Sequence, residues 1–387
     1  MSTPDDQPGR LGGAVKYMLT FRRLWLTVMD TRGGDRGVEV RDMRLRRRFS
    51  ALVAAMLIAL TIGVSIRSAD AGPVLDRIKD DGYLRCGLTA SGSGLSEINK
   101  EGIWTGFFVE FCRALAAAVL DDADAIQPVE VDDIVRFDAL ADGAFDVLMA
   151  NTTWTIGRDT ARGLMFGNVL YFDGQGFLAH RNLGATTLDE VQTGTICVPG
   201  GTTTVKNLHE LTAGLDRRID VIEFSSQPAL YDAFFSHRCD IITYDRMVLS
   251  ALRQRRANNP ADYVLFPEII SKEPLSSVVS RGDDAWFQIV RWASWALLAA
   301  EELGVTQANV EDMRNSELPE IRRLLGTDAD IGEGMELTND WVVRMVRAVG
   351  NFGEIYERFL GGNGLQLPRG LNGLWKDGGL HYVPPIR

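Results

Sequence analysis

Short apolar runs alternate with amphipathic segments along the chain from about residue 74 onward. Brief apolar runs bounded by Gly, Pro or Asp are typical of buried strands, whereas apolar residues spaced three and four apart indicate one face of a helix. This strand–helix alternation predicts an α/β fold with parallel strands. Strands are expected within 83–88, 129–131, 146–149, 195–198 and 239–245, and helices near 74–79, 107–120, 134–140, 202–208, 231–235, 286–303 and 341–349.

Two extended passages interrupt this pattern, and the strand–helix rhythm is present on both sides of the first. Gly174–Ala179 is expected to connect the first half of the chain to a second half with a similar pattern. Tyr263–Ser280, which contains two prolines, is expected to return to the first. We therefore expect two lobes. The limits are 72–178 for the first part of lobe 1, 179–268 for lobe 2, and 269–387 for a crossover, the second part of lobe 1 and a C-terminal helical extension.

The first 71 residues differ from the rest. A basic segment (Met43–Arg48), an apolar run (Phe49–Ile66) and a small-x-small site (Ala69–Ala71) follow one another in the order of a secretory signal peptide. The alternative is a membrane anchor, since the apolar run is near the lower length limit for a span. We expect cleavage after Ala71 and translation from Met43, which would make residues 1–42 a mis-annotated extension.

The charge of the remaining chain excludes some partners. Residues 1–71 hold 12 of the 41 Lys and Arg and 7 of the 52 Asp and Glu, so residues 72–387 carry a net charge of −16. An acidic chain of this kind is a poor candidate for binding nucleic acid or an anionic membrane surface.

Four cysteines lie in the part of the chain expected to be exported: Cys86, Cys112, Cys197 and Cys239. An even number in an exported chain suggests disulfides, with three pairings open, and buried free thiols are the alternative. No pair has C-x-x-C spacing and the chain has only 4 His, so no metal site is expected.

The segment Asn151–Arg158 is the first candidate for a binding site. It follows a buried apolar run, Phe145–Met149, and ligands of parallel sheets bind beyond the carboxyl ends of strands. Arg158 offers a planar fork of donors suited to a carboxylate. The alternative is an ordinary polar loop with a solvated Arg.

Two further features follow strands in the second half. Thr202 and Thr203 begin a helix after the Pro199–Gly201 turn, where backbone N–H groups attract an anion. Asp245 ends a strand, where its carboxylate can hold an ammonium. A simple helix cap and a turn residue are the respective alternatives. Together with Arg158, these groups would match the carboxylate and the ammonium of a zwitterionic α-amino acid.

Several strings of the chain match a known family. The chain resembles the periplasmic solute-binding proteins of polar amino-acid ABC transporters (solute-binding protein family 3), and within them the group that binds L-amino acids generally. The resemblance covers residues 74–387. Its strings are Trp104–Gly106, Asn151–Thr155, Tyr171–Phe177, Gly201–Thr204, Pro267–Leu275 and Gly378–Arg387.

The resemblance implies a type II fold of two lobes, each a mostly parallel sheet flanked by helices, joined by two crossover strands. By similarity Arg158 takes the ligand carboxylate with Thr203 and the backbone around Thr153, and Asp245 takes the ammonium with Asn151. It also implies disulfides Cys86–Cys112 and Cys197–Cys239, each within one lobe. One departure is two extra residues between Arg158 and Phe166 compared with simpler members, which bears on the position of Arg158.

The function that this resemblance implies is uptake. A monomeric periplasmic protein would bind L-amino acids of many kinds, without a cofactor and without catalysis, and deliver them to permease subunits in the inner membrane. Trp104, Phe137 and Trp154 are candidates to line a side-chain pocket, with core packing as the alternative for each.

Two other functions compete with uptake. One is a periplasmic cyclohexadienyl dehydratase on the same scaffold, which would need a positioned acid or base, although no His falls in the cleft motifs. The other is the sensing domain of a receptor. Against it, no second apolar span or signalling segment follows residue 71.

Overall fold

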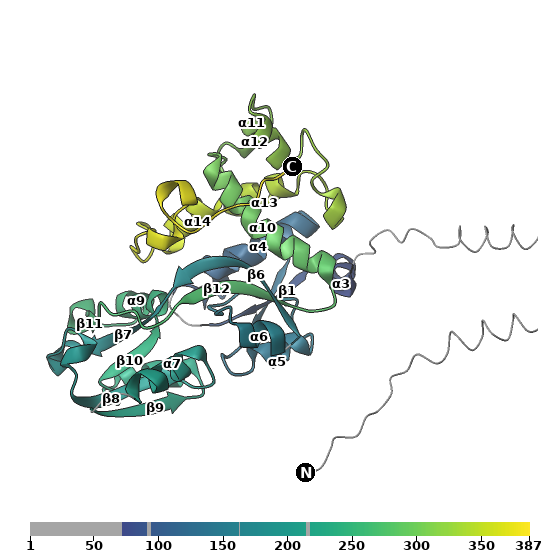
Figure 1. Ribbon diagram of the computed structural model, residues 1–387. Helices are drawn as coiled ribbons and strands as arrows, with labels where there is room; N and C mark the ends of the chain where they lie inside the picture. Colours follow the sequence, from purple (N-terminus) through teal and green to yellow (C-terminus); the bar gives the residue numbers. More distant parts are fainter. Residues whose placement is uncertain (1–71, 91–93, 162, 214–216) are drawn as a thin grey trace, which may run out of the picture. The chain divides into compact units, whose positions relative to one another are not determined.

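The computed structural model describes residues 72–387 apart from 91–93, 162 and 214–216 (Figure 1). The expected extension, signal peptide, cleavage site and start at Met43 all fall in residues 1–71. These predictions therefore lie outside the described residues.

The first lobe is built on a sheet of five strands in the order β4-β1-β5-β12-β6. Its β1 pairs parallel with β4 and β5, whereas β12 pairs antiparallel with β5 and β6. Four of the five strands therefore point the same way, as the strand–helix alternation predicts. The strands are β1 (Leu84–Leu88), β4 (Ile126–Glu130), β5 (Val147–Leu148), β6 (Leu164–Asp173) and β12 (Glu273–Ser280), and a separate hairpin pairs β2 (Glu97–Ile98) with β3 (Trp104–Thr105).

The second lobe repeats this plan in the order β11-β7-β10-β8-β9. Here β8 pairs parallel with β9 and β10, and β7 alone runs against its neighbours β10 and β11. The prediction of two mostly parallel sheets is confirmed. The strands are β7 (Gln175–His180), β8 (Thr193–Pro199), β9 (Arg218–Phe224), β10 (Ile241–Asp245) and β11 (Tyr263–Leu265).

The chain first passes between the sheets at Gly174, between the end of β6 and the start of β7. The expected connector Gly174–Ala179 is instead mostly β7, whose residues are all buried. The lobe limit expected at residue 178 therefore falls inside a strand, and we place it at Gly174. The reason is pairing: β7 hydrogen-bonds β10 on one side and β11 on the other, so it belongs to the second sheet.

The chain returns to the first sheet between β11 and β12, and the limit expected at residue 268 falls within this return. The two crossings meet where Glu273 of β12 pairs with Asp173 of β6. In Figure 1, β6 and β12 lie side by side and lead towards the second sheet.

Helices cover the sheets and form the C-terminal extension. In the first lobe, almost every side chain of α4 is buried because this helix packs between β1 and α13. The extension is anchored by α10, which contacts β6, α4, α13 and α14. The helices are α3 (Pro73–Asp81), α4 (Phe107–Leu120), α5 (Arg136–Ala141), α6 (Ile156–Ala161), α7 (Thr203–Thr212), α8 (Gln227–Phe235), α9 (Arg246–Arg255), α10 (Asp284–Glu302), α11 (Val310–Met313), α12 (Pro319–Leu324), α13 (Trp341–Val349) and α14 (Phe352–Phe359), with 3₁₀ turns at Arg181–Leu183, Leu188–Glu190, Pro260–Asp262, Glu333–Met335, Gly370–Asn372 and Trp375–Asp377.

The four cysteines form two disulfides, and each joins elements of a single lobe. Cys86 of β1 is bonded to Cys112 of α4, and Cys197 of β8 to Cys239, with Cα–Cα distances of 6.3 and 5.8 Å. The pairing implied by the family resemblance is confirmed.

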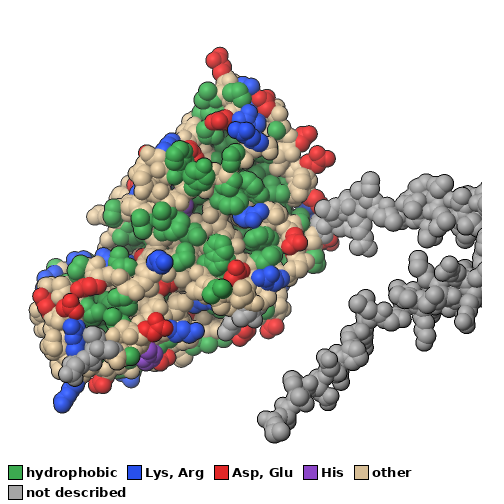
Figure 2. Space-filling view, viewed as in Figure 1, with side chains coloured by type: hydrophobic (Ala, Val, Ile, Leu, Met, Phe, Trp, Pro, Cys, Tyr) green, Lys and Arg blue, Asp and Glu red, His purple; other side chains and the backbone are tan. Residues whose placement is uncertain are grey.

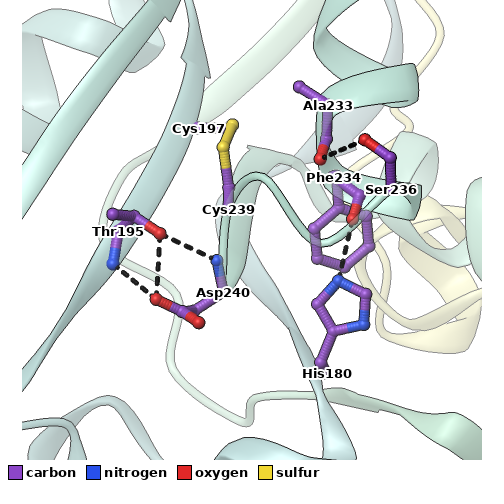
Figure 3. Close-up of a disulfide and its surroundings, with 8 residues drawn as sticks. All are labelled: His180, Thr195, Cys197, Ala233, Phe234, Ser236, Cys239 and Asp240. Carbon is purple, nitrogen blue, oxygen red and sulfur yellow. Dashed lines mark hydrogen bonds between the residues drawn. A yellow bond between two sulfur atoms is a disulfide. The ribbon is translucent and has the colours of Figure 1, made fainter.

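Hydrogen bonds brace the chain beside the second disulfide (Figure 3). The Asp240 carboxylate accepts from the backbone N–H and the hydroxyl of Thr195 at 2.8 and 2.9 Å. The ring of His180 hydrogen-bonds the Phe234 carbonyl at 2.8 Å. These contacts tie β7, β8 and the end of α8 to the residues around Cys239.

The described surface mixes apolar and charged side chains. On the face shown in Figure 2, apolar side chains lie over the C-terminal helices and first lobe, and charged groups are scattered among them. Across the described ranges of the chain, no helix combines the length and apolar character needed to cross a membrane.

Candidate functional site

A hydrogen bond between the lobes marks the centre of the candidate site. Asn151 follows β5 of the first lobe, and Asp245 is the last residue of β10 of the second. Both side chains are buried, and the Asn151 amide Nδ2 donates to Asp245 Oδ2 over 2.7 Å. Two residues assigned by similarity to the same ammonium are thus in contact across the lobes.

Asp245 sits in an environment that disfavours its negative charge. Burial raises the pKa of the Asp245 carboxyl well above its ordinary value, and the charges of Asp173 and Glu273 act in the same direction. The Asn151 hydrogen bond acts against this rise. Within the described part of the chain, no Lys or Arg forms an ion pair with Asp245. A ligand ammonium would supply the missing positive charge.

Arg158 is a half-buried cation at the site. It lies in α6, its Nη1 donates to the Thr153 carbonyl over 2.9 Å, and its guanidinium lies 5.1 Å from the centre of the Phe137 ring. Burial lowers the pKa of Arg158 to about 10, and the charge of Arg136 contributes to this shift. No carboxylate of a described residue forms an ion pair with Arg158. The guanidinium therefore has donors available for an anion.

The N-terminus of α7 faces the same region. Thr202 caps the helix: its Oγ1 accepts from the Val205 N–H at 3.4 Å and donates to the Pro199 carbonyl at 2.8 Å. Gly201 has φ +71°, which a side chain rarely adopts, and so allows the sharp turn into the helix. The Thr203 hydroxyl lies 3.5 Å from the Thr153 hydroxyl of the other lobe. The structure thus brings these two threonines together.

Glu273 is a site residue that the sequence did not reveal as such. It is fully buried at the start of β12, and its carboxylate accepts from the hydroxyls of Thr153 and, at 3.4 Å, Thr203. Ser271 and Asn207 bond its other oxygen at 2.5 and 3.2 Å. A signal was present, because Glu273 lies in the family string Pro267–Leu275, but nothing in the local sequence shows that it faces two threonines from different lobes.

A hollow of about 230 Å³ lies beside Arg158. Both lobes contribute to it, with α5 and α6 on one side and the start of α7 on the other. The side chains that define its chemistry are Asp133, Phe137, Arg158, Thr202, Thr203 and Lys206. Of the three aromatic residues considered for a side-chain pocket, the structure places Phe137 here.

The other two aromatic candidates lie elsewhere. Trp154 stacks on Phe166, with ring centres 6.1 Å apart, and lines a different hollow together with Phe287 and Trp295. Trp104 pairs with Ile98 in the small hairpin and packs against the core. Neither lines the hollow beside Arg158.

The described residues show no cluster of three or more His, Cys, Asp or Glu side chains able to hold a metal ion. The site instead offers the Arg158 guanidinium, the Lys206 ammonium, a helix N-terminus, hydroxyls, an amide and carboxylates. These groups can orient a small zwitterion by charge and hydrogen bonds.

Two sheets of mostly parallel strands, two crossings and a polar site between the lobes define a two-lobed binding protein of type II. The comparisons with known proteins are more specific, although no family model matches the chain. It is 43% identical over 341 residues to the general L-amino acid-binding periplasmic protein AapJ of Rhizobium johnstonii, covering 87% of this chain and 98% of that protein. It is 41% identical to the glutamate/glutamine/aspartate/asparagine-binding protein BztA of Rhodobacter capsulatus, covering 85% of this chain and 98% of the relative.

A solved structure agrees with these relatives. It is an ABC transporter/periplasmic binding protein from Brucella ovis with glutathione bound, similar at a TM-score of 0.79 and 42% identity over 81% of this chain and 99% of that one. The chain belongs to the family of periplasmic amino-acid-binding proteins of ABC transporters.

Proposed function

We propose that this chain binds free L-amino acids between its lobes and delivers them to the permease of an amino-acid ABC transporter. The observation that carries the proposal is that a half-buried guanidinium, Arg158, and a buried carboxyl group, Asp245, lie at one site without ion-pair partners in the described part of the chain. A zwitterionic α-amino acid supplies a carboxylate to the first and an ammonium to the second.

The neighbouring groups support this orientation of the ligand. The N-terminus of α7, capped by Thr202, offers backbone N–H donors to the carboxylate. The hydroxyls of Thr153 and Thr203, which donate to Glu273, border the same region. The Asn151 amide, which donates to Asp245, would share the ammonium site with it. Recognition through groups common to all α-amino acids favours broad specificity, with affinities of about micromolar, or roughly −8 kcal/mol. Phe137 and the hollow beside it would receive the side chain, whereas Trp104 and Trp154 would contribute to packing.

The proposal also concerns catalysis, oligomeric state, export and the closure of the lobes. The relatives are solute-binding transport proteins, and we propose that this chain likewise acts without catalysis, as a periplasmic monomer. Export would use the signal peptide within 43–71, cleaved after Ala71, and closure on the ligand would be a hinge motion of the two lobes about the crossings.

Isothermal titration tests the proposal. The chain from Gly72 to Arg387 is unfolded with its disulfides intact, dialysed and refolded to remove bound ligand. It is then titrated with the twenty L-amino acids, prephenate and glutathione.

We expect micromolar binding of several chemically different amino acids. Binding of one amino acid alone would keep the transport function and make the hollow beside Phe137 the selector. Absence of binding to any amino acid would contradict the proposal. Conversion of prephenate to a product would instead identify the protein as a dehydratase.

A further inference from the structure

A second set of buried contacts joins the lobes beside the candidate site. Asp133, between β4 and α5 of the first lobe, reaches the second lobe. Its Oδ2 accepts from the Tyr244 hydroxyl at 2.5 Å and from the Gln227 amide at 3.1 Å. These two side chains come from β10 and α8 of the second lobe and are themselves 2.9 Å apart. All three side chains are buried.

The remaining oxygen of Asp133 is held within the first lobe. Arg136 donates from Nη1 to Asp133 Oδ1 over 2.7 Å, and the same nitrogen lies 3.5 Å from the carbonyl of Asn151. Although Asp133 borders the hollow beside Arg158, both of its oxygens are bonded by protein groups. The cluster therefore contacts the ligand-binding residues through Arg136 without needing a ligand to complete it.

The pKa of Tyr244 keeps the proton of the interlobe hydrogen bond on the phenol. Burial raises the pKa of Tyr244 well above its ordinary value, and the charge of Asp133 acts in the same direction. The phenol consequently remains the donor and the carboxylate the acceptor. A hydrogen bond to a charged acceptor contributes more than a neutral one, and it exists only while the lobes are together.

We propose that Asp133, Tyr244 and Gln227 form an interlobe latch that raises the affinity for every ligand by favouring the closed state, through hydrogen bonds that do not involve the ligand. The inference rests on the proposed function. Because a latch shifts the equilibrium between open and closed forms, its loss scales all apparent affinities by one common factor. A residue that contacts a ligand side chain would instead change the affinities of some ligands and not others.

The test compares Tyr244→Phe and Gln227→Leu with the wild type in titrations with L-glutamate, L-glutamine and L-leucine. Each variant removes one bond to Asp133 and leaves Arg158, Asn151 and Asp245 in place. We expect Tyr244→Phe to weaken binding of every ligand that the wild type binds by about tenfold, the equivalent of a charge-assisted hydrogen bond. Gln227→Leu should act in the same direction, and the ratios between ligands should stay within about twofold.

Tyr382→Phe is the control for the same substitution. It removes an exposed phenol near the C-terminus and should leave affinity unchanged. Thermal unfolding of each protein without ligand shows that it has folded.

Unchanged affinity in both latch variants, or a loss confined to one ligand, would overturn the latch. A wild type that binds no amino acid would overturn the proposed function, and this is seen before any variant is compared.

Discussion

Asp245 and Arg158 are the two residues on which the proposed zwitterion site depends. Burial disfavours the charged form of both groups, and each has a hydrogen bond to a neighbour but no counter-ion among the residues described. Desolvation is unfavourable for an isolated charge, so a ligand that brings the opposite charge recovers more free energy here than it would at the surface.

At this scale we expect Arg158→Ala and Asp245→Ala each to abolish most binding. Truncating one member of a buried charge pair costs on the order of 2–5 kcal/mol. Arg218→Ala and Asp220→Ala are the matched controls, since both residues are exposed on β9. Titration with an amino acid that the wild type binds measures the difference. Affinity close to wild type in either site variant would contradict the assignment of that residue.

The raised pKa of Asp245 predicts that binding releases protons. The ammonium requires the ionised carboxylate, whereas burial favours the protonated form in the free protein. Below the raised pKa, affinity should therefore increase as pH rises, with up to about one proton released per ligand. Titration in buffers of different ionisation enthalpy measures this number.

Asp173 provides the control for that release. Burial raises the pKa of Asp173 to about 7, and this carboxyl is bonded to the backbone N–H groups of Gly174 and Met247. If Asp245 is the source, the release persists in Asp173→Asn but moves to lower pH, because the charge of Asp173 raises the pKa of Asp245. Loss of the release at every pH in that variant would assign the proton to Asp173 and contradict the prediction.

Among the elements, α7 is one that local sequence predicts and that begins at the candidate site. The sequence predicts its start correctly, because a Gly-Gly turn followed by Thr is typical of a helix N-terminus. Other elements were not predicted, among them β2, β3, β6, β9, α6 and α9. In β6 and β9, apolar and polar residues alternate imperfectly, and both strands lie at sheet edges, where only one neighbour supports them.

We expect Thr202→Ala to lower the free energy of unfolding by about 1 kcal/mol, the usual contribution of an N-cap. The variant loses the bond from the Val205 N–H and the bond to the Pro199 carbonyl. Thr202→Ser keeps the hydroxyl and should remain near the wild type. Urea unfolding of the ligand-free protein measures both, and equal stability of the Ala and Ser variants would contradict a capping role.

For the whole molecule, the division of covalent and non-covalent links decides what can move. Each disulfide stays inside one lobe, whereas the described contacts between the lobes near the site are hydrogen bonds. Hydrogen bonds can break and reform during a hinge motion, so the lobes are stiffened individually without being locked together.

It follows that removing a disulfide should affect stability more than affinity. The bridges span 26 and 42 residues, for which loop-closure entropy gives about 3–4 kcal/mol each. We expect the double variants Cys86→Ala with Cys112→Ala, and Cys197→Ala with Cys239→Ala, to unfold at lower urea while binding ligand within about twofold of the wild type. A large loss of affinity at full folding would show that a bridge supports the site directly.

The sequence alone determined the class of fold, because strand–helix alternation depends on local apolar spacing. It also supplied the types of the charged residues at strand ends, and the family strings assigned roles to them. Only the tertiary structure decided which groups meet. It showed β7 to be a strand of the second sheet, set Trp154 away from the hollow that Phe137 lines, and placed Glu273 and Asp133 against side chains of the other lobe. Such contacts join residues 70 to 111 positions apart, and the physical reason they escape the sequence is that no local period records which distant strand end lies opposite.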